Sequence, residues 1–336
     1  MRVDTHPGQK LRKVAAAAAL VSGAFAATSQ GEVVYRVGFD GAAGTTNGSA
    51  ISGVTGGTAS IRDNGGTDST SSVVTAAPDL GGGGYLRSFV PANGSTPAPS
   101  TPQGARFTPA SAANSLAAMY SVSEGQARLN GGFDFFFRPI ASDIAGAAPG
   151  QQVRFLDESA TGSGGLRMVF AGPASSSDVR LEVIATAGGF TNPAGNSVSS
   201  FSIEAAPAFQ MTADNIYHLG VTFSTDSAGL VTAKVFGIQG SGAIDTAATT
   251  VAGGLLKTQQ FDINEDVVTS MTGLPTGAFD FGMLQAGNSP RNQDFDEFRL
   301  YDVSPAQFAA NVPEPAALGL LCAGALGLLA RRRHTG

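Results

Sequence analysis

The feature that most constrains the fold is a long series of short apolar segments separated by turns rich in glycine, serine and threonine. In the most apolar of them, Phe133, Phe135 and Phe137 occupy alternate positions, and alternate residues of a β-strand share one face. Only residues 111–120 have the alanine and leucine content of a short helix. Many short strands with almost no helix predict an all-β sandwich or barrel. The expected strands are residues 33–39, 85–89, 133–139, 153–157, 165–171, 179–185, 200–204, 216–222, 232–238, 279–284 and 295–301.

Two stretches between these segments are predicted as loops. Residues 42–72 contain isolated apolar residues among Gly, Thr, Ser and Asn, which predicts long loops with one or two weak strands. Residues 91–109 are rich in Pro, Ser and Thr and predict a surface loop. The only cysteine, Cys322, lies near the C-terminus, so the residues before it can form no disulfide with one another. A large apolar core must therefore stabilise the fold.

The N-terminus has the pattern of a secretory signal peptide. Lys10, Arg12 and Lys13 precede an apolar run, and Ala24 and Ala26 supply the small residues that a signal peptidase prefers. We predict a signal helix at residues 1–27 that is removed during export through the general secretion machinery.

The C-terminus consists of three parts in order: Pro313-Glu314-Pro315, the uncharged apolar residues 316–330, and Arg331-Arg332-Arg333. In lipid, such a segment can satisfy its backbone only as a helix. Fifteen residues at about 1.5 Å each span roughly 22 Å, less than the ~30 Å hydrocarbon core. We therefore predict a short transmembrane helix that anchors the protein transiently in the inner membrane, with the arginines on the cytoplasmic side. The alternative is a buried C-terminal helix of a soluble domain.

Val312-Pro313-Glu314-Pro315, the apolar helix and the terminal arginines together resemble the PEP-CTERM sorting signal of Gram-negative bacteria. The resemblance implies that an exosortase recognises the tail and cleaves it near Pro313-Glu314-Pro315 during export of the protein to the cell surface or extracellular matrix. It also implies three parts: the signal peptide at residues 1–27, one β-sandwich at 28–311, and the sorting signal at 312–336.

Four segments of the predicted sandwich, residues 35–41, 132–139, 216–223 and 294–302, resemble strands of the concanavalin A-like jelly roll in its laminin-G-like branch. That family of lectin and glucanase folds implies binding of carbohydrate or matrix components. The chain has no tryptophan, which weakens any expectation of an aromatic sugar-stacking platform. The ends contain seven basic and two acidic residues; without them 13 basic and 24 acidic residues remain, a net charge near −11. This charge argues against nucleic acid or anionic lipid as a ligand.

No catalytic residue is predicted. Glucanases of this architecture place two carboxylates on one strand as Glu-x-Asp-x-x-Glu, a string that is absent here. Between the two ends there is one histidine, His218, and no cysteine, so nucleophilic catalysis and zinc binding lack their usual groups. In the matching strand of the laminin-G-like family, a histidine at the position of His218 is more often a packing or hydrogen-bonding residue.

Calcium is the one cofactor with candidate ligands, because it accepts carboxylates from irregular loops. Asp294 and Asp296 share a strand face and Glu297 follows them; the other acidic group is Asn264, Glu265 and Asp266. Solvated or capping acids are the alternative interpretation. The resulting hypothesis is a non-catalytic surface or matrix protein that binds exopolysaccharide or other matrix proteins. A polysaccharide hydrolase or lyase on the same fold, and a purely architectural protein, are the alternatives.

Overall fold

The chain divides into two units, residues 1–30 and 31–336, and the computed structural model describes residues of the second only. The predicted signal peptide, the predicted tail helix and the alternative acidic group at residues 264–266 all lie outside the described residues. In some strands, including those between residues 152 and 204, only the backbone is described. Among described residues, no helix is both long and apolar enough to cross a membrane. The described residues are 31–41, 47–62, 72–74, 80, 84–90, 103–139, 152–157, 165–171, 178–184, 190–191, 197–198, 200–204, 209, 211, 214–263, 278–285 and 291–311.

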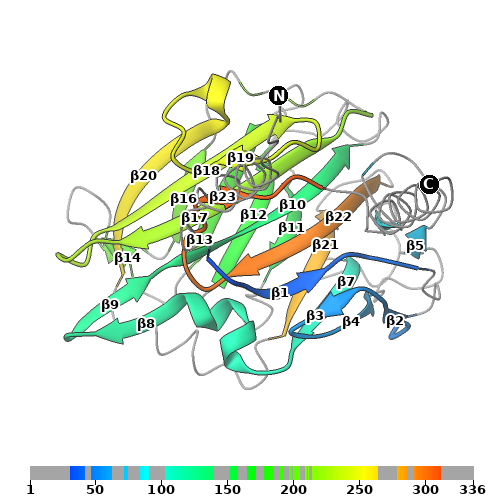
Figure 1. Ribbon diagram of the computed structural model, residues 1–336, viewed down its shortest axis with the longest axis horizontal. Coiled ribbons are helices and arrows are strands. Elements are labelled where there is room, and N and C mark those ends of the chain that lie inside the picture. Colours follow the sequence, from blue (N-terminus) through cyan, green and yellow to red (C-terminus); the bar gives the residue numbers. More distant parts are fainter. Residues whose placement is uncertain are drawn as a thin grey trace, which may run out of the picture. The chain divides into compact units, whose positions relative to one another are not determined.

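Two large antiparallel sheets form this unit (Figure 1). Sheet A has eleven strands in the order β15-β14-β20-β18-β17-β10-β22-β1-β3, with β6 also paired to β22 and β5 to β6. Its strands are β1 (Val33–Val37), β3 (Val54–Thr55), β5 (Ser72–Val74), β6 (Tyr85–Val90), β10 (Gly131–Pro139), β14 (Phe190–Thr191), β15 (Ser197–Val198), β17 (Tyr217–Thr225), β18 (Val231–Gln239), β20 (Leu255–Ile263) and β22 (Arg291–Tyr301).

Sheet B has eight strands in the order β16-β13-β12-β11-β21-β7-β4-β2. Many neighbours in both sheets are distant in sequence, as in β10 between β17 and β22. The prediction of an all-β jelly-roll sandwich is confirmed. The strands of sheet B are β2 (Ala50–Ile51), β4 (Gly57–Arg62), β7 (Gln103–Pro109), β11 (Gln152–Asp157), β12 (Gly165–Ala171), β13 (Asp178–Ile184), β16 (Ser200–Glu204) and β21 (Phe279–Gln285).

Phenylalanine rings from both sheets fill the core between them. The centroid of Phe281 on β21 lies 5.0 Å from that of Phe295 on β22 and 5.4 Å from that of Phe135 on β10. Phe133, Phe135 and Phe137 are fully buried in this core, so the predicted shared face is confirmed. Aromatic pairs at such distances contribute about 0.5–1.5 kcal/mol each beyond their buried area. These contacts hold sheet A against sheet B.

A β-bulge in β22 determines which of its side chains face outward. Glu297 has φ of 49°, and the pairing with β10 shifts register between Asp134 and Phe136. The bulge adds one residue to one strand and so changes the alternation of faces. As a result Phe295 and Phe298 both reach the core although they are three residues apart, whereas Asp296 is bonded on the opposite, outer face of sheet A.

The segment after β22 covers this outer face. Its strand β23 (Gln307–Phe308) pairs with β19 (Ile244–Asp245), and the Phe308 side chain packs against Phe236 and Tyr301 of sheet A. The Asn311 backbone N–H donates to the Ser241 carbonyl at 3.1 Å. The chain is therefore held against the sandwich up to Asn311, two residues before the Pro-Glu-Pro string.

Two expectations about local structure were wrong in part. Residues 103–109 of the predicted loop form β7, because Ala105 and Phe107 alternate into the core. The predicted helix is two 3-10 turns, η1 (Ala112–Asn114) and η2 (Leu116–Met119), where the Ser115 side chain accepts from the Ala117 N–H. Sequence reasoning also missed the hairpin of β8 (Tyr120–Ser123) and β9 (Gln126–Leu129), and β20.

Candidate functional site

Asp294, the first predicted calcium ligand, is fully buried between two arginines. Its Oδ1 accepts from Arg87 Nε at 2.8 Å, and its Oδ2 accepts from Arg138 Nε at 3.0 Å. The hydrogen bond to Asp294 raises the pKa of Arg87 above its ordinary value. Both guanidinium groups therefore supply the positive charge that a calcium ion would otherwise provide.

Asp296 and Glu297 are turned to different partners. Asp296 Oδ1 accepts from the Glu297 backbone N–H at 2.8 Å, and its Oδ2 accepts from Asn311 Nδ2 at 3.1 Å. Burial, followed by the neighbouring Glu297 charge, raises the pKa of Asp296 well above its usual range and disfavours the ionised form. Glu297 itself accepts from Arg36 Nε at 2.9 Å. No cluster of three candidate ligands occurs among the residues described, so calcium binding stays a prediction that these contacts do not favour.

His218 is a buried hydrogen-bonding residue, as expected. Its Nδ1 lies 2.7 Å from the Gly242 carbonyl and its Nε2 lies 2.7 Å from Asp134 Oδ2, while the ring stacks on Phe136. Because a carbonyl can only accept, Nδ1 carries a proton. Asp134 also accepts from Arg299 Nε at 3.2 Å, which completes a buried ionic cluster of Asp134, His218 and Arg299. Solvent does not reach this imidazole, so a substrate could not exchange protons with it.

The tyrosines are equally inaccessible. All five in the chain are at most 4% exposed, and burial raises the pKa of both Tyr35 and Tyr301. Tyrosine and histidine are common general acids and bases. In the part of the chain that the structure describes, none of these side chains lies where it could transfer a proton to a polysaccharide.

The outer face of sheet B has a polar row that sequence reasoning missed. Ser60, Arg106 and Asp280 are consecutive cross-strand partners on β4, β7 and β21. Asp280 Oδ1 lies 3.7 Å from Arg62 Nε and 3.7 Å from Arg106 Nη1. The backbone pairing extends the row through the positions of Asp157, Arg167 and Glu182. No sequence pattern reveals this row, because it depends on the pairing of strands that are far apart in the chain.

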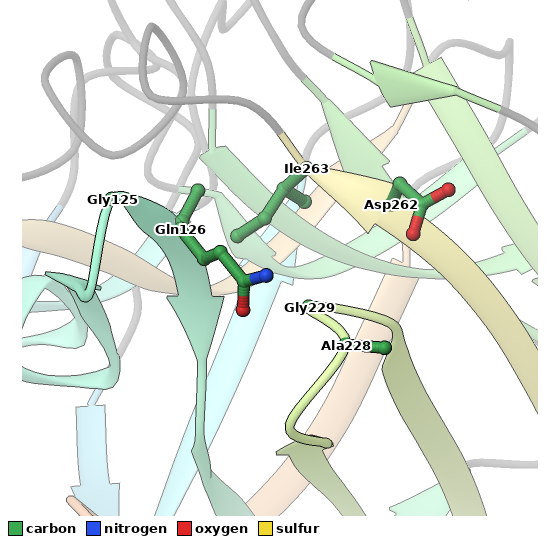
Figure 2. Close-up of a pocket in the computed structure, with 7 residues that line it drawn as sticks. Gly125, Gln126, Ala228, Gly229, Asp262 and Ile263 are labelled. Atoms are coloured by element: carbon green, nitrogen blue, oxygen red, sulfur yellow. The ribbon is translucent and has the colours of Figure 1, made fainter.

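A pocket of about 370 Å³ lies at another edge, between the β8–β9 turn, the β17–β18 turn and the end of β20 (Figure 2). Glu124 and Gly125 in the β8–β9 turn both have positive φ, and the glycine is the sequence signal from which this turn could have been inferred. The lining residues are Gly125, Gln126, Ala127, Ala228, Gly229, Asp262 and Ile263.

Three solved structures illustrate what the chain is similar to. The botulinum neurotoxin type G receptor binding domain has 12% identity and a TM-score of 0.41, with coverage of 81% of this chain and 48% of that one. The endo-β-1,4-glucuronan lyase from the fungus Trichoderma reesei has 10% identity, a TM-score of 0.40, and coverage of 71% and 89%. An alginate lyase has 13% identity, a TM-score of 0.35, and coverage of 69% and 82%. The chain thus spans about half the length of the neurotoxin domain.

No curated protein matches the chain. A family model described as the PEP-CTERM protein-sorting motif matches residues 311–333, which include Pro313-Glu314-Pro315 and the three arginines. The motif begins at Asn311, the last described residue of the sandwich. The chain therefore carries a PEP-CTERM sorting motif, which implies an exported protein that an exosortase processes and sorts to the cell envelope or surface.

Proposed function

We propose that the protein is a non-catalytic component of the cell surface or extracellular matrix of a Gram-negative bacterium, and that its jelly roll binds exopolysaccharide. The sorting motif carries this proposal, because it delivers the folded unit to the place where such polymers accumulate. The secretion machinery and the exosortase are its processing partners, and the tail contacts the inner membrane only until it is cleaved.

The polar row on sheet B is the surface that we assign to the polymer. Sugars are bound by hydrogen bonds to hydroxyl groups, and guanidinium, carboxylate and hydroxyl side chains provide donors and acceptors for them. Arg106 is 38% exposed, and its neighbour Thr108 is exposed. The outer face of sheet A is less suited to this task, because the segment containing Phe308 covers part of it.

The burial of His218 and of the five tyrosines supports binding without turnover. Asp294 and Glu297 are paired with arginines, and the pKa of Asp296 is raised by burial. A glycosidase needs two carboxylates, one on each side of the scissile bond. Asp294, Asp296 and Glu297 do not face a common cleft in this way.

The experiment is cosedimentation of the exported protein with exopolysaccharide from the producing cells. We expect Arg106→Ala to weaken binding at least about tenfold, since hydrogen bonds from a charged group contribute about 1.5–3 kcal/mol. Lys257→Ala is the control, because it removes the same charge from an exposed position on β20. Equal binding by all three proteins would refute the assignment to sheet B, and no binding by the unaltered protein would refute the function.

A further inference from the structure

We propose that the pocket in Figure 2 is a subsite for one neutral sugar unit, an inference that rests on the proposed polysaccharide-binding function. Three segments far apart in the sequence build it: the β8–β9 turn, the β17–β18 turn and the end of β20. Its volume of about 370 Å³ lies in the lower part of the range typical of small-ligand sites, roughly 300–1,000 Å³.

Local hydrogen bonds fix the walls of the pocket. Asp226 Oδ1 accepts from the Ala228 N–H at 2.8 Å and from the Leu230 N–H at 3.0 Å, which holds the β17–β18 turn. Gly229 in this turn has φ of 89°, and a Cβ there would lie 3.5 Å from Gln126 Cδ. A side chain at this φ would be strained, which favours glycine in the turn, and the Gln126 amide extends toward residues 228–229 in Figure 2. The site is therefore formed before any ligand binds.

The polar groups of the pocket are hydrogen-bond acceptors that a hydroxyl group of a ligand could satisfy. Gln126 Oε1 is buried and accepts no hydrogen bond within the described part of the chain, and buried acceptors in proteins are nearly always satisfied. Asp262 is exposed on another wall and adds a second acceptor. A sugar hydroxyl can donate to either group, and the apolar Ile263 can contact the C–H surface of a sugar ring.

Charge selects among polar ligands. The carboxylate of Asp262 and the net charge near −11 both oppose an anionic sugar. A metal ion is disfavoured as well, since Asp262 is the only acidic side chain among the described residues that line the pocket. A neutral sugar brings donors without either penalty, so the geometry points to a neutral unit of the matrix polymer.

Saturation-transfer NMR on the exported protein tests this with glucose, galactose, mannose and the anionic glucuronate as probes. We expect binding of at least one neutral sugar, weaker binding of glucuronate, and a loss of about tenfold in Gln126→Ala, corresponding to one hydrogen bond. Gln126→Met keeps the side-chain length without the acceptor and should lose as much while folding normally. Gln259→Ala, which removes a partly exposed amide from β20, should bind like the unaltered protein.

The outcomes separate this proposal from the function on which it rests. If both Gln126 variants bind sugar normally, or if glucuronate binds as tightly as the neutral sugars, the subsite is refuted. Exopolysaccharide binding that is lost in Arg106→Ala but unchanged in the Gln126 variants would leave the proposed function intact. If the unaltered protein binds neither sugar nor exopolysaccharide, both proposals fall.

Discussion

Removing the charge of Asp134 tests whether the buried cluster of Asp134, His218 and Arg299 is structural. In Asp134→Asn, the guanidinium of Arg299 keeps its contacts with the Ala309 carbonyl and the Phe136 ring but loses its counter-charge. Its side chain is only 8% exposed, so water cannot replace the carboxylate. Breaking a buried ion pair from one side costs about 3–5 kcal/mol. We expect about 3 kcal/mol because two contacts remain, which corresponds to a Tm lower by roughly 6–12 °C.

Urea unfolding of the exported protein measures this free energy. Glu124→Gln is the control, because it breaks the 3.9 Å pair of Arg128 with a carboxylate whose side chain is 86% exposed and should cost under about 0.5 kcal/mol. The double variant Asp134→Leu/Arg299→Met should recover part of the loss, since it removes the unpaired guanidinium together with the carboxylate and leaves only His218 without its partner. A cost below about 1 kcal/mol for Asp134→Asn would refute the reasoning. Polysaccharide binding should not change, because the cluster is buried away from both proposed binding surfaces.

Three further predictions concern the tail and the carboxylates of β22. Replacing Pro313, Glu314 and Pro315 with alanine should leave the tail uncleaved, seen as an intact mass of the exported protein; normal processing would show that the string is not the recognition element. The raised folded pKa of Asp296 means that its contribution to stability is complete below the unfolded value near 3.9 and is lost as pH rises through the folded value. Urea midpoints should therefore fall with pH more steeply in the unaltered protein than in Asp296→Asn, and parallel curves would contradict the burial argument. Calcium and EDTA should give the same Tm, because arginines already pair with Asp294 and Glu297; a rise with calcium would restore the predicted site.

The core strands were predictable because their side chains alternate. Phe133, Phe135 and Phe137 repeat with the period of a strand, and the glycines before and the proline after this short segment favour a strand over a buried helix. Strand β7 was missed because prolines precede it, and only its pairing with β4 and β21 shows that Ala105 and Phe107 enter the core. Tertiary pairing here outweighs local composition.

The candidate sites were less predictable than the fold. The shared face of Asp294 and Asp296 follows from alternation, but their arginine and asparagine partners come from β6, β10 and the segment after β22. The bulge at Glu297 could not be inferred, because a glutamate has no preference for positive φ. The sorting motif was recognisable because all its parts are contiguous in sequence, whereas the polar row and the pocket each join distant segments.

The most direct test of the central claim is binding and turnover measured together on one preparation. The exported protein is incubated with exopolysaccharide, and bound protein, new reducing ends and new unsaturated ends are measured from the same samples. We predict saturable binding with no new ends of either kind. Release of ends that a single carboxylate substitution abolishes would contradict the account and identify an enzyme.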